Sequence, residues 1–209
     1  MESYKKVSLT IDTEILPAFF GILRKGVKVD GDVGLSIGNF LRKGMGMSPE
    51  YIEGRIQTIF LNGKPVDNVE AAAVEDGDVM ALSASMPGLA GATLRKGGHF
   101  AGLRSAISYS EKEAVKSTGR GRITIKLFNL LTKEMAPLFL EHGVIVGGDD
   151  LAAFLNSQYK TSRAALKSIE IDGKRADTEQ LEKTDWSQKE VFLRVNVSES
   201  PAGNGRKEA

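Results

Sequence analysis

The 209-residue chain contains no cysteine. Disulfides, thiolate metal sites, iron–sulfur clusters and cysteine nucleophiles are therefore excluded. Its two histidines, His99 and His142, stand far apart without an obvious set of carboxylates, which is a poor pattern for a metal site. The absence of disulfides is consistent with a reducing cytoplasm, so we expect a cytoplasmic protein without a metal ion or other cofactor.

Neither sign of charge dominates, with 28 basic against 27 acidic residues. Because binding to nucleic acid by counterion release needs a basic surface, we expect no nucleic-acid partner. Long apolar runs are also missing. The longest candidate, residues 15–23, is interrupted by Pro17 and is far shorter than the roughly 20 residues that span a bilayer. No apolar signal-peptide core stands near the N-terminus either, so we expect no membrane association.

What the chain does contain is an internal repeat. Residues 26–32 (Gly-Val-Lys-Val-Asp-Gly-Asp) return as residues 143–149 (Gly-Val-Ile-Val-Gly-Gly-Asp). Residues 59–64 (Ile-Phe-Leu-Asn-Gly-Lys) return in the same order as residues 169–174 (Ile-Glu-Ile-Asp-Gly-Lys). Two signatures that recur in one order indicate a duplicated unit of about 80–100 residues.

Each copy is expected to begin with an antiparallel hairpin. In the first copy, residues 7–11 alternate between apolar and polar types, and a second apolar run follows closely at 19–23. In the second copy, residues 123–127 and 137–141 repeat this arrangement. A helix should follow in each copy, over residues 33–43 in the first and after Asp149 in the second, and further strands should close the sheet.

The order hairpin, helix, strand, crossover and strand is typical of the β-grasp fold. Residues 140–155 (Leu-Glu-His-Gly-Val-Ile-Val-Gly-Gly-Asp-Asp-Leu-Ala-Ala-Phe-Leu) resemble the strand-to-helix passage of the sulfur-carrier proteins of thiamine and molybdopterin biosynthesis. Residues 61–66 (Leu-Asn-Gly-Lys-Pro-Val) and 74–79 (Val-Glu-Asp-Gly-Asp-Val) look like the turn and closing strand of that family. The resemblance covers most of both copies.

The repeat and this resemblance together imply an α+β protein with two β-grasp (ubiquitin-like) domains in tandem, each a mixed sheet with one helix packed across it. The first domain is expected at residues 1–86 and the second at 121–198. A glycine-rich connector and linker (87–120) would join them, and a disordered tail would follow at 199–209.

The connector is the stretch that fits neither copy. Residues 87–104 hold five glycines, three basic side chains, one histidine and no acid. Residues 87–91 (Pro-Gly-Leu-Ala-Gly) resemble the reactive tail of the sulfur carriers, and residues 94–98 (Leu-Arg-Lys-Gly-Gly) resemble the diglycine end of ubiquitin. Both chemistries need a terminal carboxylate, which an internal glycine lacks, so only cleavage after Gly98 would make this chain a carrier.

These observations favour a non-catalytic binding or adaptor protein, because polar groups of the types that catalysis uses are sparse and scattered. A protein partner or a second copy of the chain would dock on a sheet face or edge. A processed or degenerate sulfur carrier stays open, as do an anionic small-ligand sensor and a purely structural connector.

Glycines expose backbone N–H groups and basic side chains supply charge, which makes the connector the candidate region for ligand or partner binding. It has no phosphate-loop signature, because Gly97 is followed by glycine rather than by Lys and Ser or Thr. The candidate residues are Arg95, Lys96, Gly97, Gly98, His99 and Arg104.

Overall fold

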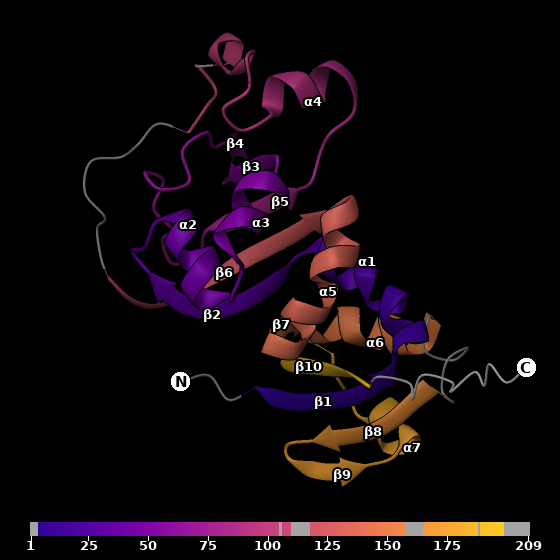
Figure 1. Ribbon diagram of the computed structural model, residues 1–209. Helices are drawn as coiled ribbons and strands as arrows, with labels where there is room; N and C mark the ends of the chain where they lie inside the picture. The colour runs from indigo at the N-terminus through magenta and orange to yellow at the C-terminus, as the bar shows by residue number, and fades with distance from the viewer. Residues whose placement is uncertain (1–3, 105, 110–117, 158–164, 188, 199–209) are drawn as a thin grey trace, which may run out of the picture.

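A computed structural model describes residues 4–104, 106–109, 118–157, 165–187 and 189–198 (Figure 1). The expected tail at 199–209 and part of the expected linker lie outside these residues. Among the described residues, ten strands form one mixed sheet in the order β4-β3-β5-β6-β2-β7-β10-β1-β8-β9. The expected α+β class is therefore confirmed.

Five strands come from each copy of the repeat. Those of the first copy are β1 (Lys5–Asp12), β2 (Val27–Val33), β3 (Thr58–Leu61), β4 (Lys64–Pro65) and β5 (Val79–Ser83). Those of the second copy are β6 (Gly119–Phe128), β7 (Val144–Gly147), β8 (Leu166–Ile171), β9 (Lys174–Ala176) and β10 (Glu190–Ser198).

Helices connect the strands in both copies. The first copy contains the 3₁₀ helix η1 (Thr13–Phe19), α1 (Phe20–Lys25), α2 (Ile37–Asn39), the π-helical turn η2 (Phe40–Gly44) and α3 (Pro49–Gly54). The connector contains α4 (Gly88–Leu94) and the 3₁₀ helix η3 (Ala101–Arg104). The second copy contains α5 (Leu130–His142), α6 (Gly148–Ser157) and α7 (Thr178–Lys183).

The expected hairpins are wrong. Residues 13–25 form η1 and α1, and the run at 137–141 belongs to α5. The buried residues explain the difference, because they recur at helical rather than alternating spacing. In η1 and α1 they are Ile15, Leu16, Phe19, Ile22 and Leu23, and in α5 they are Leu131, Thr132, Ala136, Phe139 and Leu140. The helix expected at 33–43 starts later, at Ile37, because Asp30 and Asp32 extend β2 instead of capping a helix.

The two copies exchange their first strands, so neither copy forms the separate sheet that we expected. Strand β1 lies between β10, to which it runs parallel, and β8, to which it runs antiparallel. Leu9 of β1 faces Val195 on one side and Ile169 on the other. Strand β6 of the second copy lies between β2 and β5 of the first. Each half therefore completes the sheet of the other.

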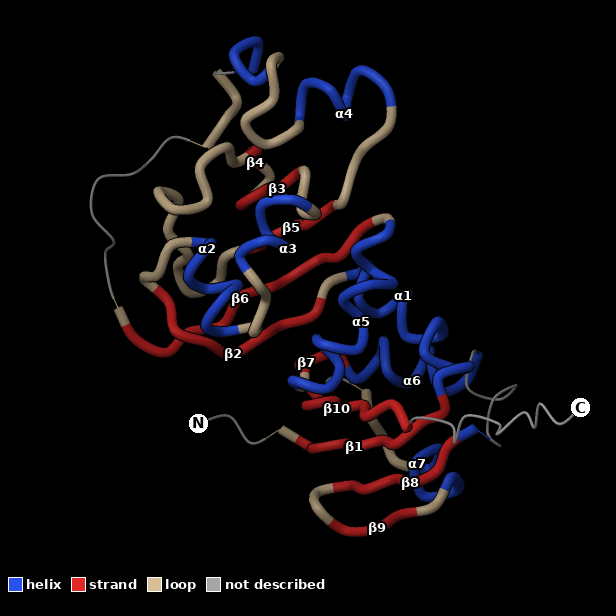
Figure 2. The backbone as a smooth tube through the Cα atoms, in the orientation of Figure 1, coloured by secondary structure: helices blue, strands red, loops and turns tan. Residues whose placement is uncertain are grey.

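The helices between the strands form one core with one face of the sheet. Helix α1 contacts both α5 and α6, and α5 lies against β6 and β10. Figure 2 shows these helices gathered where the two groups of strands meet. The rings of Phe19 and Phe154, which come from different copies, lie 4.5 Å apart between centroids. The buried side chains of both copies accordingly belong to a single hydrophobic cluster.

Polar contacts also tie α3 of the first copy to α5 of the second. The Tyr51 hydroxyl donates to Glu134 Oε2 at 2.7 Å, and Arg55 Nε lies 2.9 Å from the same oxygen. The hydrogen bond from Arg55, with that from Tyr51, lowers the pKa of Glu134 from 4.5 to about 2. Burial, reinforced by the hydrogen bond to Glu134, raises the pKa of Tyr51 well above its usual value.

Within the described part of the chain, no helix is long and apolar enough to cross a membrane.

The strand exchange predicts that the two halves stay together after the chain is cut. We would insert a protease site between residues 109 and 119, cleave it, and follow both fragments by gel filtration. They should co-elute in native buffer, because β1 and β6 each lie between strands of the other half. They should separate in denaturant. Fragments that elute apart in native buffer would contradict the exchange.

The lowered pKa of Glu134 predicts an acid-dependent part of the stability. A carboxylate with a lowered pKa stabilises the fold above its unfolded pKa, and this contribution is lost as the pH falls toward the folded value. The wild-type protein should therefore exceed a Glu134→Gln variant in urea stability at about pH 6, and the difference should shrink between about pH 4.5 and pH 2. A difference that does not change with pH would contradict this assignment.

Candidate functional site

The glycine-rich connector folds back against the end of the sheet instead of lying extended. Helix α4 lies beyond β3 and β5, to which a loop joins it (Figure 1), and its Gly91 lies close to Met86 of that loop. A Cβ atom on Gly91 would lie 1.6 Å from the carbonyl oxygen of Met86, so only glycine allows this close approach. The glycine content of the connector is thus explained in part by packing.

Arg104 holds the connector in this position. Its side chain is only 4 % exposed, and it pairs with Asp67 through Nη1–Oδ2 at 3.0 Å and Nη2–Oδ1 at 2.7 Å. Nε donates to the Thr93 carbonyl at 2.6 Å, Nη2 to the Arg95 carbonyl at 3.3 Å, and Nη1 to Ser108 Oγ at 2.7 Å. These bonds occupy all five donors of the guanidinium, so Arg104 has a structural role here.

The neighbouring candidate residues also have partners within the protein. Lys96 Nζ donates to the Ile52 carbonyl at 3.0 Å, and Gly97 N donates to Asp67 Oδ1 at 3.0 Å. Gly98 N donates to the Arg95 carbonyl at 3.1 Å. His99 is exposed, and its ring makes an edge contact with Phe100. The six candidates therefore lie close in the chain without forming one anion-binding cradle.

Arg95 differs from the other basic residues of the connector. Its backbone is fixed by Gly91, Gly98 and Arg104, while its guanidinium makes no hydrogen bond or ion pair with the described residues. It lines a cavity of about 410 Å³ between α4 and the ends of β3 and β5, together with Thr58, Ser85, Met86, Gly91 and Ala92. A ligand role for this side chain stays a prediction.

Thr58, which lines this cavity, carries an unsatisfied polar atom beside it. The residue is 1 % exposed, and its Oγ1 has no hydrogen-bond partner among the described residues. A buried hydroxyl without a partner costs about 1–3 kcal/mol, and few such groups persist in folded proteins without a reason. The hydroxyl oxygen itself is covered, so a group in the cavity would reach it only after the atoms over it move aside.

A second, mostly apolar cavity of about 290 Å³ adjoins the first at Met86. It is lined by Phe60, Ala81, Ser83, Met86, Pro87, Phe128 and Asn129. Alternation along the strands explains its position: Ile59 and Leu61 enter the core, so Thr58 and Phe60 occupy the opposite face of the sheet. We call the two cavities together the Met86 groove, with a polar compartment at Thr58 and Arg95 and an apolar compartment at Phe60 and Phe128.

The wall of the apolar compartment contains a strained residue. Asn129 has φ 55° and ψ −136°, outside the regions that non-glycine residues normally adopt. Its Nδ2 donates to Ser83 Oγ at 2.8 Å and to the Ser85 carbonyl at 2.7 Å. Strained conformations of this kind persist where surrounding contacts fix them, and they concentrate at functional sites.

A charged network lies on the same outer face of the sheet. Arg122 Nε lies 2.8 Å from Asp30 Oδ1, and its Nη1 lies 3.1 Å from Glu190 Oε2. Lys28 also pairs with Glu190, and the group borders a cavity of about 860 Å³. Burial raises the pKa of Asp30, while Arg120 opposes the shift. Because these charges pair with one another across β2, β6 and β10, they connect strands rather than leave a vacant ligand site.

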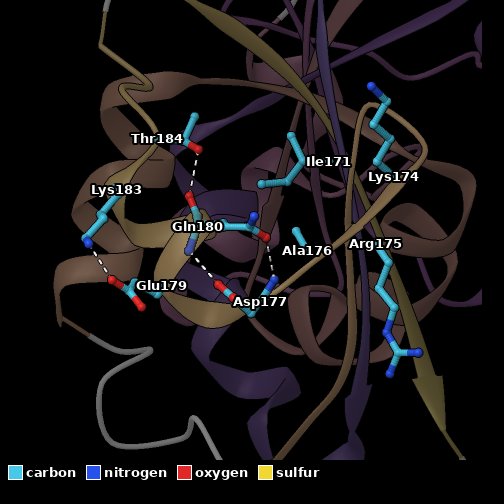
Figure 3. A pocket seen from close by; sticks show the side chains of 9 residues that line it. All are labelled: Ile171, Lys174, Arg175, Ala176, Asp177, Glu179, Gln180, Lys183 and Thr184. Carbon is cyan, nitrogen blue, oxygen red and sulfur yellow. Dashed lines mark hydrogen bonds and ion pairs between the residues drawn. The ribbon is translucent and has the colours of Figure 1, made fainter.

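The cavity between β9 and α7 offers little chemistry. Figure 3 shows Asp177 and Gln180 bonded to each other in a helix cap, and Lys183 paired with Glu179. Lys174 and Arg175 extend from the β9 side. Within the described ranges, no cluster of three or more His, Cys, Asp or Glu side chains could hold a metal ion.

Residues 34–38 (Gly-Leu-Ser-Ile-Gly) match the Gly-x-Ser-x-Gly pattern of serine hydrolases and run from the end of β2 into the start of α2. The sequence candidates above do not include this pattern. Ser36 has φ −61° and ψ 153°, without the strain of a nucleophile elbow, and its Oγ accepts from Asn39 N at 3.1 Å. Helix capping therefore accounts for this serine.

Comparison with protein families, with curated proteins and with solved structures gives no match to this chain. The function must therefore be argued from the site. The Met86 groove includes one sequence candidate, Arg95, but sequence reasoning missed Thr58, Phe60 and Phe128. The sequence does contain a signal for the two aromatic residues. Phe60 and Phe128 occupy strand positions that alternate with core residues, where polar side chains are usual.

The hydrogen bonds of Arg104 predict that replacing this arginine lowers the free energy of unfolding much more than replacing Arg95 of the same segment. Replacing Arg104 by alanine should lower the free energy of unfolding by about 2–3 kcal/mol, because Asp67 and two carbonyls lose their donor. Arg95→Ala is the matched control and should change it by less than about 0.5 kcal/mol. Urea unfolding of both variants tests this. Equal stabilities of the two variants would contradict a structural role for Arg104.

Proposed function

We propose that this chain is a non-catalytic binding or adaptor protein of the cytoplasm that docks a partner polypeptide in the Met86 groove. The observation that carries the proposal is the groove itself, an apolar compartment joined at Met86 to a polar one. Binding sites typically combine an apolar concave surface with a few polar groups that fix orientation. Phe128 is 39 % exposed, and the next apolar residue along, Leu130, is 54 % exposed.

We further propose that the scaffold consists of two β-grasp-like units with exchanged first strands. In the order β2-β6-β5-β3, neighbouring strands are antiparallel, parallel and antiparallel. The order β7-β10-β1-β8 has the same three relations. This is the pattern of a β-grasp sheet, and it supports the resemblance to the sulfur carriers at the level of architecture.

The position of the connector favours binding over a carrier role. In a carrier, the residues after the closing strand must reach an activating enzyme as an extended tail. Here Gly91 lies within α4, while Gly98 N bonds to the Arg95 carbonyl and the Gly98 carbonyl accepts from Ala101 N at 2.9 Å. The diglycine is thus part of a folded turn, so we rank the processed carrier second.

The proposal predicts that a single charged side chain, introduced into the apolar compartment by mutation, prevents the partner from binding. We would compare wild-type protein with Phe128→Glu by crosslinking in the native cell and quantitative mass spectrometry. Recovery of a specific partner should fall about tenfold, since loss of a single apolar anchor often costs 1–2 kcal/mol of binding energy.

The matched control is Leu103→Glu, which changes an apolar residue that is 79 % exposed and lies in η3, outside the groove lining. Thermal unfolding of both variants checks that the fold is intact. Identical recovery from the wild-type and Phe128→Glu proteins would overturn the proposed docking site. Recovery of only a second copy of this chain would replace the partner by a homo-oligomer.

A further inference from the structure

We propose that the polar compartment of the Met86 groove binds the C-terminal carboxylate of the partner polypeptide, and that the apolar compartment binds its last side chain. The inference rests on the proposed docking function and names the chemistry that the groove recognises. Four features carry it: the unsatisfied Thr58 hydroxyl, the Arg95 guanidinium, the absence of opposing acids, and the adjoining apolar compartment.

The donors of the polar compartment suit a carboxylate. A guanidinium presents its N–H groups in a plane that matches two carboxylate oxygens. Thr58 and Ser85 line the same compartment; Ser85 is exposed, and the buried Thr58 hydroxyl has no hydrogen-bond partner among the described residues. If the atoms that cover Thr58 Oγ1 move aside when the ligand enters, a carboxylate oxygen would accept the hydrogen bond that this hydroxyl lacks in the free protein.

The charges of the residues that line the groove also favour a ligand with a single negative charge. Of the described residues that line either compartment, none is acidic and Arg95 is the basic one. Lys96 is directed to the Ile52 carbonyl and Glu53, and Arg104 has all its donors occupied. A single unneutralised guanidinium matches a carboxylate better than a phosphate, which carries more charge.

The adjoining compartment distinguishes a peptide end from other anions. The two compartments share Met86, so a ligand that fills both carries an apolar group next to its anionic group. The last residue of a polypeptide has this arrangement, with the carboxylate and the side chain on one Cα atom. A nucleotide would instead place a polar sugar against Phe60 and Phe128.

The rest of the connector then has a positioning role. Arg104 donates to the Arg95 carbonyl, and Gly91 accepts from Arg95 N at 3.1 Å, so the backbone of Arg95 is held while its side chain stays available. Gly91 also sets the approach of α4 to Met86. Rigid placement of this kind lowers the ordering cost of binding.

The test is an NMR titration of the full ¹⁵N-labelled chain with two acetylated hexapeptides, one ending in Leu and one in Phe. Each is prepared as the free acid and as the C-terminal amide. We expect the acid to bind about tenfold more tightly than the amide, as for other hydrogen bonds between charged groups. The amide resonances of Thr58, Met86 and Arg95 should shift.

Three variants separate binding from folding. Arg95→Ala should abolish the preference for acid over amide, whereas Arg175→Ala, at an exposed arginine of β9, should retain it. Thr58→Val keeps the shape of the side chain. It should weaken binding of the acid while leaving the melting temperature equal or higher, because an unsatisfied hydroxyl is removed.

The outcomes distinguish this inference from the proposed function. Equal binding of acid and amide, with shifts at Phe60 and Phe128, would overturn the carboxylate site but leave the docking function standing. Hexanoate that binds as tightly as the peptides would overturn the polypeptide source in favour of a small carboxylic acid. If neither free-acid peptide shifts the groove resonances at millimolar concentration, the inference is wrong, and the crosslinking experiment decides the docking function separately.

Discussion

The parallel pairing of β1 with β10, and the matching placement of β6 between β2 and β5, determine most other features of this molecule. Strand β1 supplies Val7, Leu9 and Ile11 to the core from the strand group β7-β10-β1-β8-β9, whose other members come from the second copy. Each copy thus holds the first strand of the other, and the pairing of β2 with β7 at Lys28 and Ile145 joins the two groups of strands into one sheet. The helical crossovers follow from this arrangement, because the first strand of each copy must be carried away from its neighbour in sequence.

The Met86 groove depends on the same exchange. Its apolar compartment is formed by Phe60 and Ala81 of the first copy together with Phe128 of the second, and β6 brings Phe128 beside β5. The connector then completes the polar compartment, because Arg104 and Gly91 fix α4 above Thr58. The ion pair of buried Arg104 with Asp67 and one glycine thus set the geometry of a groove whose lining residues come from three separate segments.

The sequence predicted the α+β class, the repeat and most strands, because alternation and turn signals are local. The apolar runs at 19–23 and 137–141 were wrongly predicted as strands, because a short apolar run fits a strand or a buried helix equally well. Residues such as Ile15 and Leu16 extend the first run to a helical spacing. The exchange was beyond sequence reasoning for a different reason. Both copies present similar apolar first strands, so the pattern does not specify which sheet each strand joins.

The site was predicted only in part. Arg95 was among the candidates because of its charge and its glycine-rich surroundings. Arg104 has the same charge and the same surroundings in the sequence, yet its side chain is buried and paired with Asp67, and no local pattern distinguishes the two arginines. Thr58 carried no signal in the sequence, because an unsatisfied hydroxyl is recognised only when all neighbouring donors and acceptors are known.

The placement of β1 has a consequence for synthesis of the chain. Residues 5–12 leave the ribosome long before their two neighbours in the sheet, β8 and β10, which begin only at Leu166 and Glu190. At translation rates of about 5–20 residues per second, β8 and β10 are synthesised on the order of ten seconds or more after this apolar strand. Newly made chains therefore pass through a period in which an unpaired strand is open to chaperones, or to the same strand of another nascent copy.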